Sequence, residues 1–404
     1  MIKLTRQLFF LIFFTIIFIS CVKAQSGKTN NDSDILWLKK GLEVSKKQLK
    51  LAANFYKPGQ NPRSIWPDNT NRLASVKDWT CGFFPGSLWY MYEITSDDFF
   101  KEKAEKYTDA LEEVQYFTDT HDLGFMLYCS YGNGYRLTNN SSYKKVLLKG
   151  SESLATRFSK TVGCIKSWDF GNYDFPVIID NMINLELLMW ASQEKGDNLF
   201  RDIAVSHADK TLANHFRKDN SSYHLIDYDS KTGNVKRKMT HQGYLDESAW
   251  ARGQAWGLYG YVMMYTKTHK KEYLDQTIKI ADFIMNHPRL PEDKIPFWDF
   301  DAPHIPHARR DVSAATVNAS ALLELSKITN NNNYFLFAES TLKTLSNDNY
   351  LSKPGENSFF VLKHSVGNFP NYSEIDTPLN YADYYYLEAL IRYANIKGID
   401  LGKI

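Results

Sequence analysis

The stretch SAWARGQAWGLYGYVMMY, from Ser248 to Tyr265, decides the fold class. It is apolar or small on nearly every side of a helix and carries few charges. A helix without a polar face is buried all round. Five further segments have the same character: Gly86 to Tyr92, Leu123 to Ser130, Ile178 to Ala191, Ser313 to Leu325 and Tyr381 to Tyr393.

A second set of helices alternates with these buried segments. Each has apolar residues at three-and-four spacing and a charged opposite face, as a helix at a protein surface does. They are Ile35 to Phe55, Phe99 to Phe117, Tyr143 to Phe158, Asn198 to Phe216, Glu272 to Met285 and Asn333 to Leu345. The alternation predicts an all-α fold, an (α/α)6 barrel in which six inner helices are surrounded by six outer ones.

Two other architectures fit the pattern less well. A helical solenoid is built from repeats that are shorter and more alike than these. A β-rich fold needs period-two runs, which occur only briefly, near Ser222 to Asp227 and Phe359 to Lys363. No linker rich in Pro, Gly and Ser divides the chain, so we expect residues 35–404 to form a single catalytic domain.

The N-terminus predicts export from the cytoplasm. Lys3 and Arg6 precede an apolar run from Leu8 to Ile19, which is too short for a spanning helix and indicates a signal peptide in residues 1–24. The residues up to Cys21 loosely resemble a lipoprotein box, whereas Val22 to Ala24 fit ordinary cleavage. We therefore expect a periplasmic protein or a membrane-anchored lipoprotein with its lipid on Cys21.

Composition excludes several classes of site. Formal net charge is +2, which gives no case for a nucleic-acid partner. If Cys21 is removed or acylated, an odd number of cysteines remains (Cys81, Cys129 and Cys164), without CxxC spacing. This pattern argues against disulfides and against a zinc site, so we expect buried free thiols and no metal.

Polar motifs fall where a helical barrel holds its ligand, at the N-terminal ends of inner helices. They are Asp78 to Gly86, which includes Trp79; His121 to Phe125; Asp180 to Asn184; His241 to Tyr244; and Asp376 to Asp383. Asp122 and Asp180 lie about one hairpin period apart. Each alone is typical of a helix N-cap. Two aspartates in matching positions favour a catalytic pair, because nearby carboxylates raise one pKa and create a proton donor.

Arg252 is a charged residue within an otherwise apolar inner helix. It is either an ion pair with an aspartate or a clamp on a substrate carboxylate. Trp256, four residues on, shares its face of the helix. His241 and Gln242, just upstream, are candidate hydrogen-bond donors to an anionic sugar. A single histidine such as His224 is more often structural.

Taken together and in order, these motifs resemble the unsaturated glucuronyl hydrolases, glycoside hydrolase family 88. The residues that carry the resemblance are His121-Asp122, Asp180-Asn181, His241-Gln242, Ser248 to Trp256 and Tyr381 to Asp383, and it spans about residues 35–395. The resemblance implies an (α/α)6 barrel that removes a 4,5-unsaturated uronate from the non-reducing end of an oligosaccharide left by a polysaccharide lyase.

The chemistry that the resemblance implies is hydration of the C4=C5 vinyl ether, without metal or cofactor. Asp180 protonates C4 and then accepts a proton from the attacking water, while Asp122 binds sugar hydroxyls and tunes Asp180. His224, Gln242, Arg252 and Trp256 hold the uronate. His121, His241 and Trp79 complete the expected substrate contacts. The source polysaccharide, sulfate tolerance and oligomeric state stay open; Lys363 to Ser365 and Ser373 are candidates for sulfate contact.

Four alternatives share part of this pattern. An unsaturated rhamnogalacturonyl hydrolase has the same fold and chemistry with a different leaving sugar. An inverting glycosidase needs a second base across the scissile bond. A sugar 2-epimerase typically relies on paired histidines at the barrel mouth. A non-catalytic surface sugar-binding lipoprotein accounts for the aromatic residues but leaves the paired aspartates and Arg252 unexplained.

Overall fold

A computed structural model describes residues 35–404, of which Trp37–Ile404 form one compact unit. The predicted signal peptide and Cys21 lie outside the described residues. The buried segments form the inner helices, which are α2 (Phe83–Thr95), η3 (Gly124–Gly132) with α4 (Asn133–Thr138), α6 (Asn181–Lys195), α8 (Ala251–Thr268), α10 (Val312–Thr329) and α12 (Asn380–Lys397).

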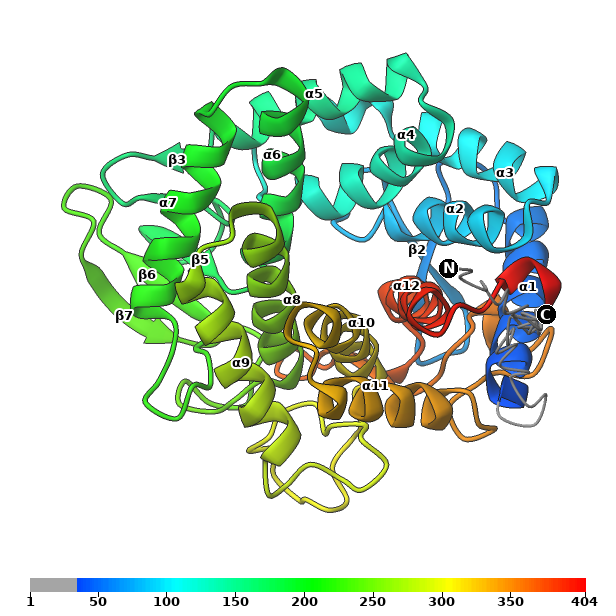
Figure 1. Cartoon of the computed structure of the whole chain (residues 1–404). Helices are drawn as coiled ribbons and strands as arrows, with labels where there is room; N and C mark the ends of the chain where they lie inside the picture. Colours follow the sequence, from blue (N-terminus) through cyan, green and yellow to red (C-terminus); the bar gives the residue numbers. More distant parts are fainter. Residues whose placement is uncertain (1–34) are drawn as a thin grey trace, which may run out of the picture. The chain divides into compact units, whose positions relative to one another are not determined.

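The amphipathic segments form the outer helices. They are α1 (Leu36–Phe55), α3 (Asp98–Asp109), α5 (Ser141–Ala155), α7 (Leu199–Asn214), α9 (Lys271–Asn286) and α11 (Asn332–Leu345). Within the compact unit, the inner helices follow one another around a ring that closes where α12 packs against α2 (Figure 1). The prediction of an (α/α)6 barrel is confirmed.

Short links join the first five inner helices to the outer helices that follow them. Ser96, Asn139, Gly196, His269 and Asn330 each end an inner helix in the left-handed region of φ and ψ. In three of these links the following residue caps the N-terminus of the outer helix. The side chains of Asp97, Asn140 and Asn331 accept hydrogen bonds from backbone N–H groups in its first turn. The tight links leave the opposite ends of the inner helices to the longer loops.

Those longer loops contain most of the short antiparallel strands. Among residues 35–404 the pairs are β1 (Asn61–Ile65) with β2 (Asn71–Ala74), β3 (Phe158–Ser159) with β4 (Cys164–Ile165), and β8 (Ser365–Asn368) with β9 (Ser373–Thr377). A three-stranded sheet has the order β5 (Phe175–Ile178), β6 (Leu225–Tyr228) and β7 (Val235–Met239).

The sequence predicted these strands poorly. Of the two expected runs, residues 222–227 overlap β6, whereas residues 359–363 form no strand. β5 and β6 are buried on both faces, so they lack the alternation that identifies a strand. Some helix bounds also differ from the prediction. The fourth inner helix, α8, starts at Ala251 rather than Ser248, and Ile178, predicted to begin the third inner helix, belongs to β5. The second outer helix, α3, ends at Asp109 rather than Phe117.

The second inner helix has an unexpected form. Residues Gly124–Gly132 wind as a π-helix, which then continues as α4. A π-helix of this length is rare, and such turns are frequent at functional sites. Hydrophobic periodicity does not separate it from an α-helix over nine residues.

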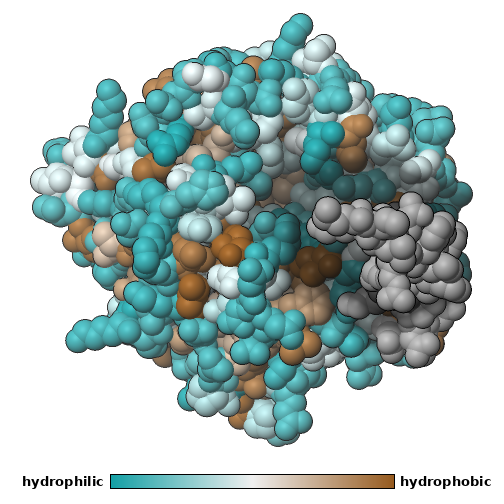
Figure 2. Space-filling view, viewed as in Figure 1, coloured by the Kyte–Doolittle hydropathy of each residue, from teal (hydrophilic) through white to brown (hydrophobic). Residues whose placement is uncertain are grey.

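The surface and the cysteines agree with a packed helical barrel. The face seen in Figure 2 is mostly hydrophilic, with hydrophobic residues in small separate patches. Cys81, Cys129 and Cys164 are buried free thiols, as expected. None of the helices between residues 35 and 404 is long and apolar enough to cross a membrane.

Candidate active site

A cavity of about 590 Å³ opens at the end of the barrel where the long loops lie. That volume suits a small saccharide. Its walls come from the start of inner helices and from the β1–β2 and β8–β9 hairpins. Seven of the residues predicted to be catalytic or to bind substrate line it: Trp79, His121, Asp122, Asp180, His241, Gln242 and Arg252.

Asp180 directly precedes α6 but does not cap it, since its carboxylate accepts no hydrogen bond from the helix. The side chain is buried, and Oδ2 has no hydrogen-bond partner among residues 35–404. Burial raises the pKa of Asp180 to about 7, and the charge of Asp122 acts in the same direction, against the effects of His121 and Arg252. A substantial fraction of Asp180 therefore keeps its proton up to about pH 7.

Asp122 lies in the opposite electrostatic state. Thr120 Oγ1 donates to its Oδ2 at 2.8 Å, and His121 Nε2 lies 3.2 Å from its Oδ1. Asn184, one turn into α6, donates to Oδ1 at 3.5 Å. Burial favours the neutral acid, but the imidazole of His121 and these hydrogen bonds outweigh it and lower the pKa of Asp122. The cavity thus holds one protonated and one ionised carboxyl group.

Arg252 takes the ion pair that the sequence left as one of two interpretations. Its Nη1 lies 3.1 Å from Asp311 Oδ2, and it also donates to the carbonyl of Val366. Nη2 donates to the carbonyl of Gly367 at 2.5 Å. Nε–H has no partner in the described part of the chain. The guanidinium therefore fixes the β8 strand to α8, and its Nε–H stays buried without a partner among these residues.

The indole beside Arg252 is not the expected one. The guanidinium lies over the ring of Trp250, with 4.6 Å from Cζ to the ring centroid. Trp256 packs instead against Phe125 and Tyr385, fully buried and outside the cavity lining. Four-residue spacing placed Trp256 on the same helix face, but the face points into the barrel core one turn below the mouth.

His224 is near the cavity without lining it. Its ring is buried and packs on Trp250, with 4.5 Å between ring centroids. Nδ1 accepts the backbone N–H groups of His241 at 2.9 Å and of Gln242 at 3.1 Å. Nε2 lies 3.6 Å from Asp180 Oδ2. His224 therefore contacts the carboxyl group rather than the open space where a sugar would lie.

Sequence patterns missed much of the remaining wall. Trp168 and Phe170 stack at 5.0 Å between centroids beside His241, whose pKa is lowered by burial. Further lining residues come from the hairpins and nearby loops: Arg63, Arg72, Lys77, Asn368, Asn371, Ser373 and Glu374. Of the proposed sulfate contacts, Ser373 lines the cavity, whereas Lys363, His364 and Ser365 do not.

The basic residues of the rim differ in how fully they are paired. Arg63 is saturated by Glu374, in a two-pronged contact at 2.8 and 2.7 Å, and by Asp78. Arg72 donates to Ser373 and lies 3.4 Å from Glu374. Among residues 35–404, Lys77 Nζ has no hydrogen bond or ion pair. Lys77 is therefore the basic side chain of the rim whose charge is free to meet an anionic ligand.

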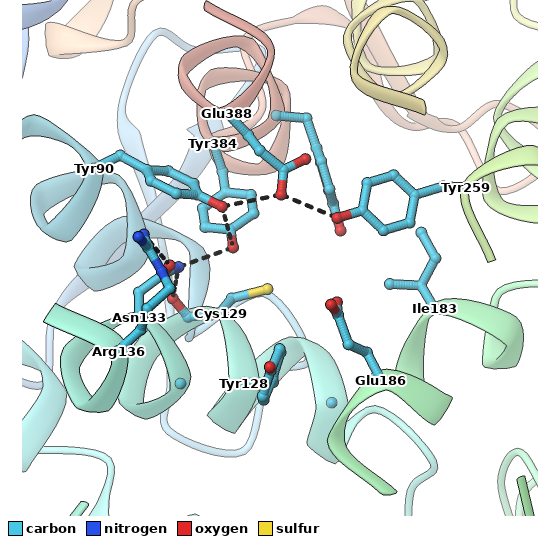
Figure 3. Close-up of a pocket in the computed structure, with 13 residues that line it drawn as sticks. Tyr90, Tyr128, Cys129, Asn133, Arg136, Ile183, Glu186, Tyr259, Tyr384 and Glu388 are labelled. Atoms are coloured by element: carbon cyan, nitrogen blue, oxygen red, sulfur yellow. Dashed lines mark hydrogen bonds between the residues drawn. The ribbon is translucent and has the colours of Figure 1, made fainter. Parts of the chain in front are cut away.

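A second, smaller cavity of about 140 Å³ lies midway along the inner helices and shares no lining residue with the first. Figure 3 shows Glu186 and Glu388 on opposite sides of it, among tyrosines. Glu388 accepts hydrogen bonds from Tyr90 and Tyr259, whereas burial and the charge of Glu388 raise the pKa of Glu186 to about 7. This network holds inner helices together and is separate from the aspartate pair.

Known proteins resemble this chain over most of its length. It is 48% identical, over 348 residues, to an unsaturated glucuronyl hydrolase of Formosa agariphila. This match covers 84% of this chain and 87% of the relative. It is 32% identical over 364 residues to an unsaturated chondroitin disaccharide hydrolase of Streptococcus pyogenes, with 87% and 90% covered. No family model matches the chain.

The fold comparison agrees. A crystal structure of an unsaturated glucuronyl hydrolase specific for heparin superposes with a TM-score of 0.90 at 58% sequence identity. The match covers 92% of this chain and 99% of that structure.

Proposed function

Because the chain belongs to the unsaturated glucuronyl hydrolases, which are glycoside hydrolases, we propose that Asp180 is the general acid of its reaction. The observation that carries this assignment is the buried carboxyl group of Asp180 at the cavity wall, whose Oδ2 has no hydrogen-bond partner among residues 35–404 and whose pKa burial raises to about 7, whereas the pKa of Asp122 is lowered. A general acid works best when its pKa lies near the working pH.

The proposed reaction hydrates the C4=C5 double bond of a terminal unsaturated uronate. Asp180 gives its proton to C4, and positive charge develops at C5 and the ring oxygen. The resulting carboxylate then takes a proton from water as the water oxygen bonds to C5. The C5 hemiketal opens to a ketone and leaves a hemiacetal at C1. As C1 becomes an aldehyde, the proton of the hemiacetal hydroxyl is lost, and the leaving sugar departs as an alcohol after its oxygen takes up a proton. Asp122, which stays ionised, is proposed to bind sugar hydroxyls and to raise the pKa of Asp180.

The cavity supports an anionic sugar as ligand. Lys77 and Arg72 provide positive charge with unused donors at the cavity wall. Trp79 and Trp168 offer aromatic faces for sugar rings, and Gln242 and His121 offer polar groups. We propose a heparin-derived disaccharide as the first substrate class to test, because the structure described as specific for heparin is 58% identical.

The test follows the ultraviolet absorbance of the conjugated uronate during incubation with unsaturated disaccharides from heparin, chondroitin and hyaluronan. We expect loss of absorbance with wild type and a loss of at least about 100-fold in rate in Asp180→Asn, because that variant lacks the transferable proton. Equal rates in the two proteins would contradict the assignment of Asp180. Turnover of chondroitin but not heparin disaccharides would replace the substrate class.

We also propose that the protein is exported, in line with its N-terminal signal, and that Cys21 carries a lipid. Fractionation of cells that produce wild type or Cys21→Ser tests this proposal. We expect wild type in the membrane fraction and the variant in the soluble periplasmic fraction. Wild type in the soluble fraction would contradict the lipid anchor.

A further inference from the structure

His224 is held rigidly between the acid and the loop that precedes α8. Its carbonyl accepts the backbone N–H of Ile179, the residue before Asp180, at 3.0 Å. Its ring is packed on Trp250 and is only 3% exposed. A ring fixed on both sides presents its nitrogens in constant directions.

The hydrogen bonds of His224 determine its tautomer. Nδ1 accepts two backbone N–H groups, from His241 and Gln242, so it carries a lone pair and no proton. A neutral imidazole must then carry its proton on Nε2. Burial lowers the pKa of His224 well below its ordinary value, and His241, Arg252, His215 and His121 add to that effect. The ring is therefore neutral throughout the working pH range.

The Nε2–H group faces Asp180. The distance from Nε2 to Oδ2 is 3.6 Å, and neither atom has another hydrogen-bond partner among residues 35–404. The gap is just longer than a hydrogen bond, and such contacts at active sites commonly shorten when substrate binds. A donor fixed on Oδ2 leaves Oδ1 as the oxygen that carries the acidic proton.

We propose that His224 is a positioning residue that donates Nε2–H to Asp180 Oδ2, aims the acidic proton of Oδ1 into the cavity, and steadies the carboxylate once that proton is gone. This inference rests on the proposed function of Asp180. It differs from the role implied by family resemblance, in which His224 holds the uronate. It also ties the Gln242 loop to the acid, because one ring contacts both.

Two substitutions at the same position separate these contacts. His224→Asn places a polar group where Nδ1 lies and lacks the donor to Asp180. His224→Gln reaches the position of Nε2 and restores an N–H donor. Because a hydrogen bond to a charged group is lost, we expect kcat to fall about 10- to 100-fold in His224→Asn, with KM within about threefold of wild type. His224→Gln should recover part of kcat.

The pH profile supplies a readout that a merely structural role would not move. Asp180 is surrounded by His121, Arg252, Asp122 and His224. Loss of a donor to the carboxylate raises the pKa of Asp180 further, so the basic limb of kcat/KM should move to higher pH in His224→Asn and return in His224→Gln. A change in KM alone would overturn the proposal in favour of a contact between His224 and the substrate. An unchanged kcat together with an unmoved basic limb would also overturn it.

NMR of the unliganded protein keeps this inference separate from the proposed function. The ¹⁵N shifts of His224 should show Nε2 protonated, and the ¹³C titration of the Asp180 carboxyl should move upward in His224→Asn. Neither measurement requires the protein to turn over a substrate. If wild type is inactive on every disaccharide yet the titration moves, the proposed function fails and the positioning contact remains. If neither this titration nor the basic limb of the pH profile moves, the contact is refuted. The melting temperature of each variant confirms that it is folded.

Discussion

At the scale of single residues, the two aspartates show how burial and hydrogen-bond partners determine the charge of a carboxyl group. Both stand at the start of inner helices, where an aspartate is normally a cap. Asp122 is instead occupied by Thr120, His121 and Asn184, which favour its charge. Among residues 35–404 the carboxyl group of Asp180 has no such partners, and burial removes much of its hydration, so its pKa is raised. Similar sequence contexts therefore produce an ionised and a neutral group.

This difference predicts the pH dependence of activity. An acid with a pKa raised to about 7 is active below that pH, so kcat/KM should fall as pH rises through about 7. In Asp122→Asn a negative neighbour is removed, the pKa of Asp180 falls, and the basic limb should move to lower pH. The limb position is measured rather than the rate, because Asp122 is also expected to bind substrate.

Asp119→Asn is the matched control for that measurement. Asp119 lines the same cavity but is exposed, so solvent and salt screen its charge. We expect the limb of this variant to coincide with that of wild type. A limb that stays in place in Asp122→Asn as well would show that Asp122 does not act on Asp180 through its charge.

At the scale of elements, the barrel depends on glycines where inner helices cross. A Cβ on Gly260 of α8 would lie 2.4 Å from Cβ and 2.9 Å from the backbone carbon of Met182 in α6. A Cβ on Gly257, one turn earlier, would meet Ile179 Cγ1 at 3.4 Å, an ordinary contact. The close approach at Gly260 holds the start of α6, and with it Asp180, against α8.

Gly260→Ala should therefore destabilise the protein by about 1–3 kcal/mol, because backbone atoms cannot yield as a flexible side chain does. We also expect lower kcat, since α6 must move and Asp180 moves with it. Gly257→Ala on the same helix should change stability by less than about 1 kcal/mol, in the stabilising direction, because alanine favours a helix. Urea denaturation followed by circular dichroism compares the two. Equal losses would refute the argument from helix crossing.

At the scale of the whole barrel, Glu388 of α12 joins four inner helices across the axis. Its Oε1 accepts from Tyr90 of α2 at 3.0 Å and from Tyr259 of α8 at 2.9 Å. Ser320 of α10 donates to Oε2, and Arg392 lies 3.3 Å from Oε1 (Figure 3 draws the tyrosine bonds). One carboxylate thus connects α12 to helices on both sides of the point where the ring closes.

Glu388→Ala should cost about 3–5 kcal/mol of unfolding free energy, since it leaves Arg392 and three hydroxyl groups without their acceptor. The folded fraction should keep its KM, because Glu388 does not line the catalytic cavity. Glu324→Ala on α10 is the control; its carboxylate makes a surface ion pair with Lys327, worth well under about 1 kcal/mol. Equal urea midpoints for the two variants would contradict the assignment of Glu388.

Local pattern was enough for the helices and for the aspartate pair. Buried and amphipathic segments differ within a few turns, and motifs at the starts of buried segments pointed to Asp122 and Asp180. The strands were largely missed, because they are short, with only two residues in β3, and because β5 and β6 are buried on both faces and show no alternation. The hairpin residues of the rim were missed because their partners are distant in the sequence: Arg63 meets Glu374, a partner 311 positions away.

The sequence by itself determined the class of fold, the order of inner and outer helices and the ends at which polar motifs gather, because each depends on contacts within one or two turns of the chain. Only the tertiary structure decided which partner each polar group takes. Arg252 pairs with Asp311, and the indole beside it is that of Trp250 rather than Trp256. The ring of His224 directs its Nε2–H toward Asp180. These choices require the ring to close, since closure brings together residues that the chain keeps tens to hundreds of positions apart.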